Sequence, residues 1–127
     1  MDTGMKSILI IEDDDQLRTL LQNVLLKEGY TIFVAGNGNE GVLQAREKRP
    51  DLIITDIIMP EKEGLETIID IRKEIPHVKI IAMSGGGTYS DLSFLDVAKR
   101  LGAQQTLSKP FSATELREAV HQAFSEE

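Results

Sequence analysis

The sequence predicts an α/β domain built on one parallel sheet, because short apolar runs alternate with longer segments of helical period. Five runs rich in Ile, Leu or Val alternate with five amphipathic segments along the 127 residues. This length and the 41% hydrophobic content suit one domain with a substantial core. For five such units we expect a doubly wound sheet with strand order 2-1-3-4-5, flanked by five helices.

The first half of the chain contains three predicted strands and two predicted helices. The strands lie at residues 7–11, 31–34 and 52–55. A helix follows the first strand and ends at Gly29, and a second covers 38–48 before Pro50. The expected apolar stripe of the first helix comprises Leu17, Leu20, Leu21, Val24 and Leu25. Asp56 directly follows the third strand, whose apolar character is typical of a central parallel strand.

The second half contains two further strands and three helices. The strands lie at residues 79–83 and 105–108. The third helix carries apolar residues from Leu65 onwards and is closed by Pro76, and the fourth is stopped by Gly102. Ser112 and Glu115 have the spacing of a capping box and therefore mark the start of the last helix.

Composition excludes several classes of protein. The chain has 14 Lys and Arg against 21 Asp and Glu, a formal charge of −7, which argues against binding to nucleic acid or to an anionic membrane. There are no cysteines, so disulfides and thiolate metal sites are excluded. No apolar run is long enough to span a membrane, and the start does not resemble a signal peptide. We expect a soluble, cytoplasmic protein.

Three carboxylates are predicted to meet at one edge of the sheet. Glu12 and Asp13 follow the first strand, and Asp56 follows the third, which the expected strand order places beside the first. Three clustered carboxylates need a counter-charge. Ligands that offer only oxygen suit Mg²⁺ better than Zn²⁺. The neighbouring Asp14 and Asp15 are interpreted differently, as the solvated start of a helix.

Two further polar residues follow strands at the same edge. Ser84 ends the fourth strand and Lys109 follows the fifth. A divalent cation, a lysine, a hydroxyl and one carboxylate left for chemistry together make a site for a phosphoryl group. In such a site the carboxylate attacks phosphorus while the cation and the lysine neutralise the phosphoryl oxygens.

Four segments carry a resemblance to a known family. They read ILIIEDD, LIITDIIMPEKEG, IIAMSG and LGAQQTLSKPF, in this order along the chain. Together they resemble the receiver domain of two-component response regulators, which has the flavodoxin-like chemotaxis-regulator fold. The resemblance covers residues 6–124, so we expect residues 1–127 to form a single receiver domain that acts without an attached output domain.

The resemblance assigns roles to the acidic residues. It implies that Asp56 is the phospho-acceptor and that Asp13 is a direct Mg²⁺ ligand. Glu12 would act on the metal largely through water, and Ile58 would contribute its backbone carbonyl. The implied cofactor is therefore Mg²⁺, held by Glu12, Asp13, Asp56 and the carbonyl of Ile58.

The resemblance also assigns the switch residues. Ser84 matches the hydroxyl that turns toward the phosphoryl group, and Lys109 matches the lysine that pairs with this group. The bond between Lys109 and Pro110 would be cis, which is accessible for a bond before proline. Thr106 occupies a position that is usually aromatic in the family, so the aromatic switch at that position is not available here.

Two loops depart from the family pattern. The run from Gly85 to Gly87 lengthens the loop after the fourth strand, which suggests a modified readout, with Tyr89 and Phe94 as candidate aromatic switches. Ile58 and Gly86 stand at the positions that guide an attacking water in the family, and neither offers a side-chain hydrogen bond. We therefore expect slow self-dephosphorylation.

The leading hypothesis is a phosphorylation-controlled switch and not a turnover enzyme. A histidine kinase or phosphotransfer protein would donate the phosphoryl group. Phosphorylation would either change binding to an unknown downstream protein through the fourth helix, fifth strand and fifth helix, or be followed by onward transfer of the group along a phosphorelay; the sequence does not choose between these two outputs. A phosphatase of the haloacid-dehalogenase type is less compatible because Glu12 stands where that family needs an Asp nucleophile. A flavin mononucleotide binder is disfavoured because EDDD would repel phosphate, and a degenerate receiver is disfavoured by the complete residue set.

Overall fold

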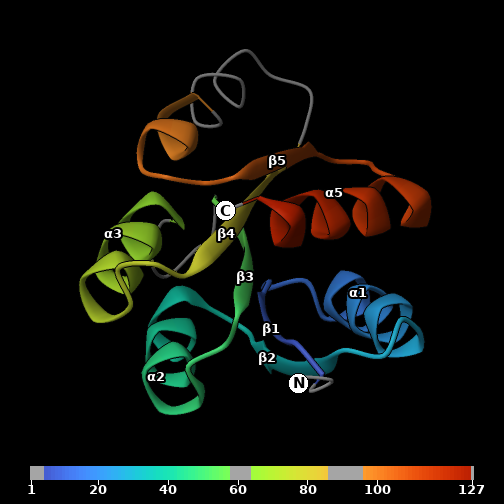
Figure 1. Cartoon of the computed structure of the whole chain (residues 1–127), viewed down its shortest axis with the longest axis horizontal. Coiled ribbons are helices and arrows are strands. Elements are labelled where there is room, and N and C mark those ends of the chain that lie inside the picture. The colour runs from blue at the N-terminus through green and yellow to red at the C-terminus, as the bar shows by residue number, and fades with distance from the viewer. Residues whose placement is uncertain (1–4, 58–63, 86–95, 127) are drawn as a thin grey trace.

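The computed structural model describes residues 5–57, 64–85 and 96–126 and contains one parallel five-stranded sheet (Figure 1). Its strands are β1 (Ser7–Ile11), β2 (Thr31–Ala35), β3 (Leu52–Asp56), β4 (Lys79–Ser84) and β5 (Gln105–Ser108). Their order is β2-β1-β3-β4-β5, and every neighbouring pair is parallel. The predicted fold class and strand order are confirmed.

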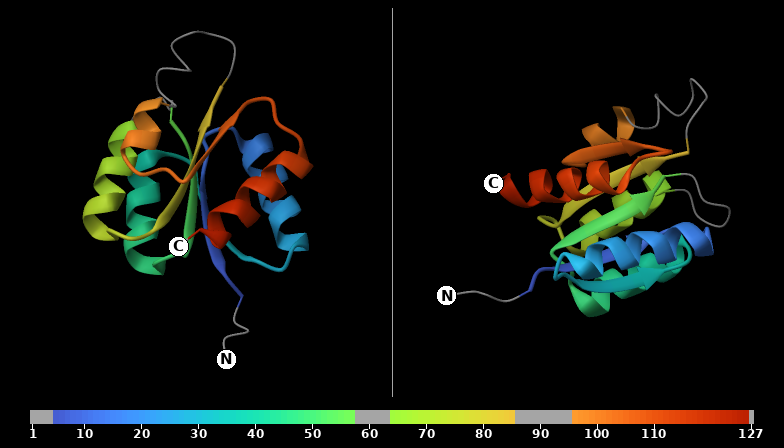
Figure 2. Two further views of the ribbon diagram at one scale, coloured as in Figure 1. Left: turned by 45° about the horizontal axis from the view of Figure 1, so that its top comes forward. Right: turned by 90° about the vertical axis from the view of Figure 1, so that its right-hand side faces the viewer.

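Helices cover both faces of this sheet, as the left view of Figure 2 makes clear. They are α1 (Asp15–Lys27), α2 (Gly38–Lys48), α3 (Gly64–Glu74) and α5 (Ala113–Ser125), with a further helical segment at residues 96–100. The helices α1 and α5 lie on one face, and α2, α3 and the segment at 96–100 lie on the other. Within the described ranges, no helix has the length and apolar character needed to cross a membrane.

Alternation along the strands divides the core between these two faces. Ile8 and Ile10 of β1 pack with α1 and α5, whereas Leu9 and Ile11 pack with α2 and α3. All four side chains are fully buried. Successive side chains of a strand point to opposite faces, so a central strand covered on both sides must be apolar throughout. In β1 and β3 the polar residues accordingly occupy the first position or the last two positions of the strand.

Helix ends follow the expected local signals. Asp14 caps α1 by accepting hydrogen bonds from the backbone of Gln16 and Leu17 at 2.9 and 3.1 Å. Ser112 and Glu115 form the complete capping box of α5. Gly29, just beyond α1, has φ 98°, a left-handed conformation that favours glycine.

The apolar stripe of α1 differs from the expectation at one position. Leu21 and Leu25 are buried, but Leu20 is 57% exposed. The reason is that helical period identifies a face of the helix but not how much of that face the neighbouring elements cover. Leu20 lines a groove between α1 and the start of α5 instead of filling the core.

Candidate functional site

The carboxyl ends of β1 and β3 bring three carboxylates together. Glu12, Asp13 and Asp56 each offer an oxygen, and these three atoms lie within 4.8 Å of one another. Glu12 and Asp56 are almost completely buried, at 1% and 4% exposure, whereas Asp13 is exposed. The cluster forms because β1 and β3 are adjacent and parallel, so residues that follow the two strands meet at one edge.

Lys109 supplies the positive charge of this cluster. Its Nζ donates hydrogen bonds to Oε1 of Glu12 at 2.9 Å and to Oδ2 of Asp56 at 2.6 Å. Lys109 follows β5, and its peptide bond to Pro110 is cis, the isomer that the resemblance implied. One cation therefore faces two buried carboxylates, with Asp13 close by, and the cluster keeps a negative charge.

Burial and pairing shift the ionisation of these groups in opposing ways. Burial is the largest influence on Glu12 and raises its pKa above the ordinary value, against the opposing hydrogen bonds from Lys109 and Asp14. Burial alone lowers the pKa of Lys109, but hydrogen bonds and charges from Asp56 and Glu12 together outweigh it, so the pKa of Lys109 is raised. Lys109 is therefore a permanent cation at neutral pH.

Ser84 and Thr106 occupy the neighbouring strands. Ser84 is fully buried at the end of β4, one residue beyond the partner of Asp56 in the β3–β4 pairing, and its Oγ donates a long hydrogen bond of 3.4 Å to the carbonyl of Gly85. Thr106 lies opposite Ala82 in β5 and is partly buried. Ser84 therefore lies at the strand end beside the carboxylates, whereas Thr106 lies two residues before the end of β5.

The donor set fits Mg²⁺. Every ligand atom in the cluster is a carboxylate oxygen, and the exposed Asp13 leaves one side open to water, which Mg²⁺ retains in protein sites. The expected carbonyl ligand, Ile58, lies outside the described residues. The same holds for Gly86, Gly87, Tyr89 and Phe94 in the loop after β4.

Three supporting contacts at this site were missed by sequence reasoning. The backbone N–H of Asp14 donates to Oε2 of Glu12 at 3.0 Å, and Arg18 donates to the carbonyl oxygen of Glu12 at 2.9 Å. The hydroxyl of the buried Thr55 donates to the carbonyl of Asp56 at 3.0 Å. A basic residue one turn into a helix after an acidic pair, and a threonine within an apolar strand, are the signals that point to such contacts.

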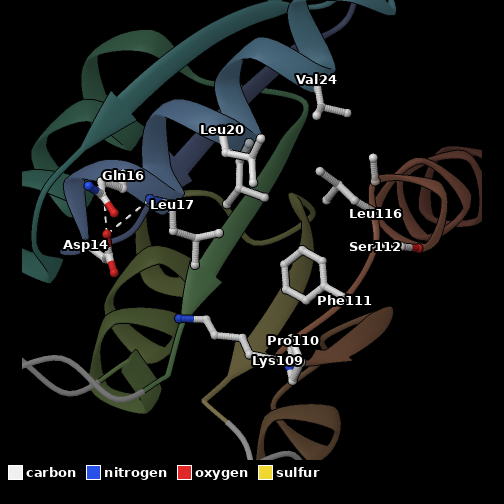
Figure 3. Close-up of a pocket in the computed structure, with 12 residues that line it drawn as sticks. Asp14, Gln16, Leu17, Leu20, Val24, Lys109, Pro110, Phe111, Ser112 and Leu116 are labelled. Atoms are coloured by element: carbon white, nitrogen blue, oxygen red, sulfur yellow. Dashed lines mark hydrogen bonds between the residues drawn. The ribbon is translucent and has the colours of Figure 1, made fainter.

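An apolar groove adjoins Lys109 (Figure 3). Its volume is about 450 Å³, and it lies between α1 and the segment that joins β5 to α5. The apolar lining is made by Leu17, Leu20, Leu21, Val24, Phe111 and Leu116. Lys109 and Asp14 line the end of the groove that approaches the carboxylates. The groove therefore adjoins the residue that pairs with both buried carboxylates.

The fold and the acidic edge define a doubly wound α/β domain whose functional groups gather beyond the carboxyl ends of the strands. More particularly, the chain belongs to the response regulator receiver domain family, whose model matches residues 8–121. It is 34% identical over 115 residues to sporulation initiation phosphotransferase F of Bacillus subtilis, covering 91% of this chain and 90% of that protein.

Other relatives agree with this assignment. The chain is 34% identical over 117 residues to the chemotaxis protein CheY of Thermotoga maritima, covering 91% of this chain and 95% of that protein. The crystal structure of a response regulator receiver domain protein from Clostridium thermocellum superposes with a TM-score of 0.88 at 28% identity, covering 95% of each chain. The chain is thus a receiver domain of the two-component response regulators.

Proposed function

We propose that Asp56 accepts a phosphoryl group from a phosphohistidine of a histidine kinase or phosphotransfer protein, in a reaction that requires Mg²⁺. The observation that carries the proposal is the pair of hydrogen bonds from Lys109 to Asp56 and Glu12 within a three-carboxylate cluster. Repulsion opposes the close approach of three carboxylates, so a bound divalent cation would stabilise this cluster. Membership of the receiver family supports the same role.

Each residue has a defined part in this reaction. An oxygen of Asp56 forms a bond to phosphorus while the bond from phosphorus to the donor's imidazole nitrogen breaks, and that nitrogen keeps the electron pair and takes up a proton. Lys109 neutralises the buried charge beside Asp56. Glu12 and Asp13 would hold Mg²⁺, which when bound would supply positive charge to neutralise the phosphoryl oxygens. Ser84 donates its hydroxyl to the transferred group.

The groove beside Lys109 supports a protein as phosphodonor. Its apolar lining extends to Lys109, which is hydrogen-bonded to Asp56. A helix of the donor protein bound in this groove would therefore bring a side chain close to Asp56. After phosphorylation we propose that binding to a downstream protein changes, through movement at Ser84 and at the adjoining β5 and α5 surface. This makes the chain a phospho-accepting switch and not a turnover enzyme.

Labelling with a small phosphodonor tests the proposal. The purified chain is incubated with acetyl phosphate or phosphoramidate and Mg²⁺, and intact mass is measured. We expect one phosphoryl group per chain, lost in Asp56→Asn and after chelation of the metal. Asp51→Asn is the matched control, because Asp51 directly precedes the amino end of β3, whereas Asp56 is at its carboxyl end.

Two outcomes contradict the proposal. A wild-type chain that never labels, or an Asp56→Asn variant that labels as well as wild type, excludes Asp56 as acceptor. Repeated release of phosphate from a phosphate ester by the purified chain would instead favour a phosphatase.

A further inference from the structure

Arg18 links helix α1 to the end of strand β1. Its Nη1 donates to the carbonyl oxygen of Glu12 at 2.9 Å, and its Nη2 lies 2.5 Å from Oδ1 of Asp15. The Arg18 side chain is only 22% exposed, whereas that of Asp15 is 86% exposed. An ion pair with so exposed a partner contributes little, so the contact with Glu12 is the informative one.

Glu12 is held from three sides. Its backbone N–H donates to the carbonyl of Ala35 at 3.1 Å, which continues the pairing of β1 with β2 by one residue. Its carboxylate accepts from the backbone N–H of Asp14 and from Lys109. Arg18 completes this set by donating to the carbonyl of Glu12. This carbonyl lies one residue beyond the end of β1, and a side chain provides its hydrogen bond.

The orientation of the Glu12 carbonyl also determines the orientation of the backbone at Asp13. This carbonyl and the N–H of Asp13 belong to one planar peptide unit, so a hydrogen bond that fixes one fixes the other. The direction of the Asp13 side chain depends on that plane. Asp13 is the exposed member of the carboxylate cluster, so burial restrains its carboxylate least.

We propose that Arg18 is a positioning residue for the divalent-cation site, holding the peptide between Glu12 and Asp13 so that the Asp13 carboxylate faces Asp56, a role that rests on the proposed function. Arg18 does not touch the cation or the phosphoryl group. It acts through the backbone, as partners of metal ligands commonly do.

A purely electrostatic role for Arg18 and a positioning role predict opposite changes in the affinity for a divalent cation when Arg18 is replaced. A guanidinium charge close to the cluster repels a divalent cation, so its removal would strengthen cation binding. A positioning role predicts weaker binding when the hydrogen bond to Glu12 is lost, even though a repulsive charge has gone. The sign of the change in affinity therefore separates the two roles.

The test measures the affinity for Mg²⁺ alone by isothermal titration calorimetry, without a phosphodonor. We expect Arg18→Gln to weaken binding roughly tenfold. Arg18→Lys keeps the charge but lacks the planar fork, and we expect it to weaken binding as well. Asp15→Asn is the matched control, because it removes the ion pair and leaves the bond to Glu12; its affinity should stay within about twofold of wild type.

A second readout covers a variant that folds poorly. In metal-free Arg18→Lys, the backbone amide resonance of Asp13 should shift, while resonances at the opposite edge of the sheet stay unchanged. Equal or tighter Mg²⁺ binding by Arg18→Gln, with wild type still labelled on Asp56, overturns the role of Arg18 and leaves the proposed function intact. A wild-type chain that neither binds Mg²⁺ nor labels overturns both.

Discussion

The backbone N–H of Lys109 donates a 2.8 Å hydrogen bond to the carbonyl oxygen of Ser84. The two residues proposed to contact the phosphoryl group are therefore joined through the main chain as well as by their position at adjacent strand ends. A displacement of Ser84 toward Asp56 would therefore act on the backbone of Lys109. The segment after Lys109 leads into α5, so this bond connects the site with the α5 surface.

Replacing Ser84 by Ala tests this connection. Without the hydroxyl, we expect Asp56 to label with a rate reduced by less than about tenfold, since one hydrogen bond is lost. With beryllofluoride as phosphoryl mimic, amide resonances of β5 and α5 should shift in wild type and stay largely unchanged in Ser84→Ala. Ser108→Ala is the control, because Ser108 pairs with Ser84 but is exposed. Equal shifts in wild type and Ser84→Ala would show that the signal takes another route.

The raised pKa of Glu12 predicts a pH-dependent cost to stability in metal-free protein. An acid whose pKa is higher in the folded chain binds its proton more tightly when folded, so its contribution falls as pH rises from 4.5 through the folded pKa. Glu12→Gln removes this effect. We expect the stability of this variant relative to wild type to increase as pH rises through that window, and to be independent of pH below 4.5.

Urea unfolding at a series of pH values, with a chelator present, measures the effect of Glu12→Gln. Glu118→Gln serves as control, because Glu118 is exposed on α5. A stability difference that does not change with pH would mean that Glu12 ionises equally easily in the folded and unfolded chains.

Much of the site was predictable because strand ends are visible in the sequence. Once the β/α alternation gave the order 2-1-3-4-5, the residues after β1 and β3 had to meet, and Glu12, Asp13 and Asp56 do so. Lys109 was assigned to the same edge by the same reasoning. These predictions needed only the position of each residue relative to a strand.

Contacts between side chains and distant backbone carbonyls were not predictable in this way. Arg72, at the end of α3, donates to four carbonyl oxygens and joins α3 to the segments that precede β4 and β5. These acceptors belong to Pro76, Val78, Leu101 and Gly102. Such contacts depend on tertiary geometry, and no local period signals them. Arg18 escaped prediction for the same reason.

The Arg72 contacts predict a clear cost of substitution. Arg72→Ala removes the guanidinium donor from two partly buried carbonyls, those of Val78 and Leu101, and we expect a loss of about 2 kcal/mol in the free energy of unfolding. Arg46→Ala is the control, since Arg46 forms an ion pair with Glu74 while half exposed and should cost less than about 1 kcal/mol. Urea unfolding at neutral pH measures both, and equal costs would contradict a special role for Arg72.

Leu20 offers a test of the proposed donor surface. It is 57% exposed and lines the groove beside Lys109, whereas Leu43 is 53% exposed on α2, across the sheet. We expect Leu20→Glu to reduce the rate of phosphotransfer at least tenfold, because apolar contact area with the donor is lost. The donor in this experiment is a kinase that labels the wild-type chain. Labelling by acetyl phosphate should stay unchanged, and Leu43→Glu should behave as wild type. Slowing with both donors would indicate damage to the site itself.

If Asp56 is the acceptor, as proposed, the lifetime of its phosphoryl group depends on how water reaches it. The side chain of Ile58, two residues after the acceptor, offers no hydrogen bond to an attacking water, so we expect the phosphoryl group to persist well beyond seconds. Ile58→Asn introduces a group that can hold such a water, and we expect it to shorten the lifetime several-fold, about the effect of one hydrogen bond. Decay of the labelled species is followed by intact mass after the donor is removed.

Ile69→Asn makes the same chemical change on the exposed surface of α3 and should leave the decay unaltered. Decay of wild type within seconds would show that another group positions the water.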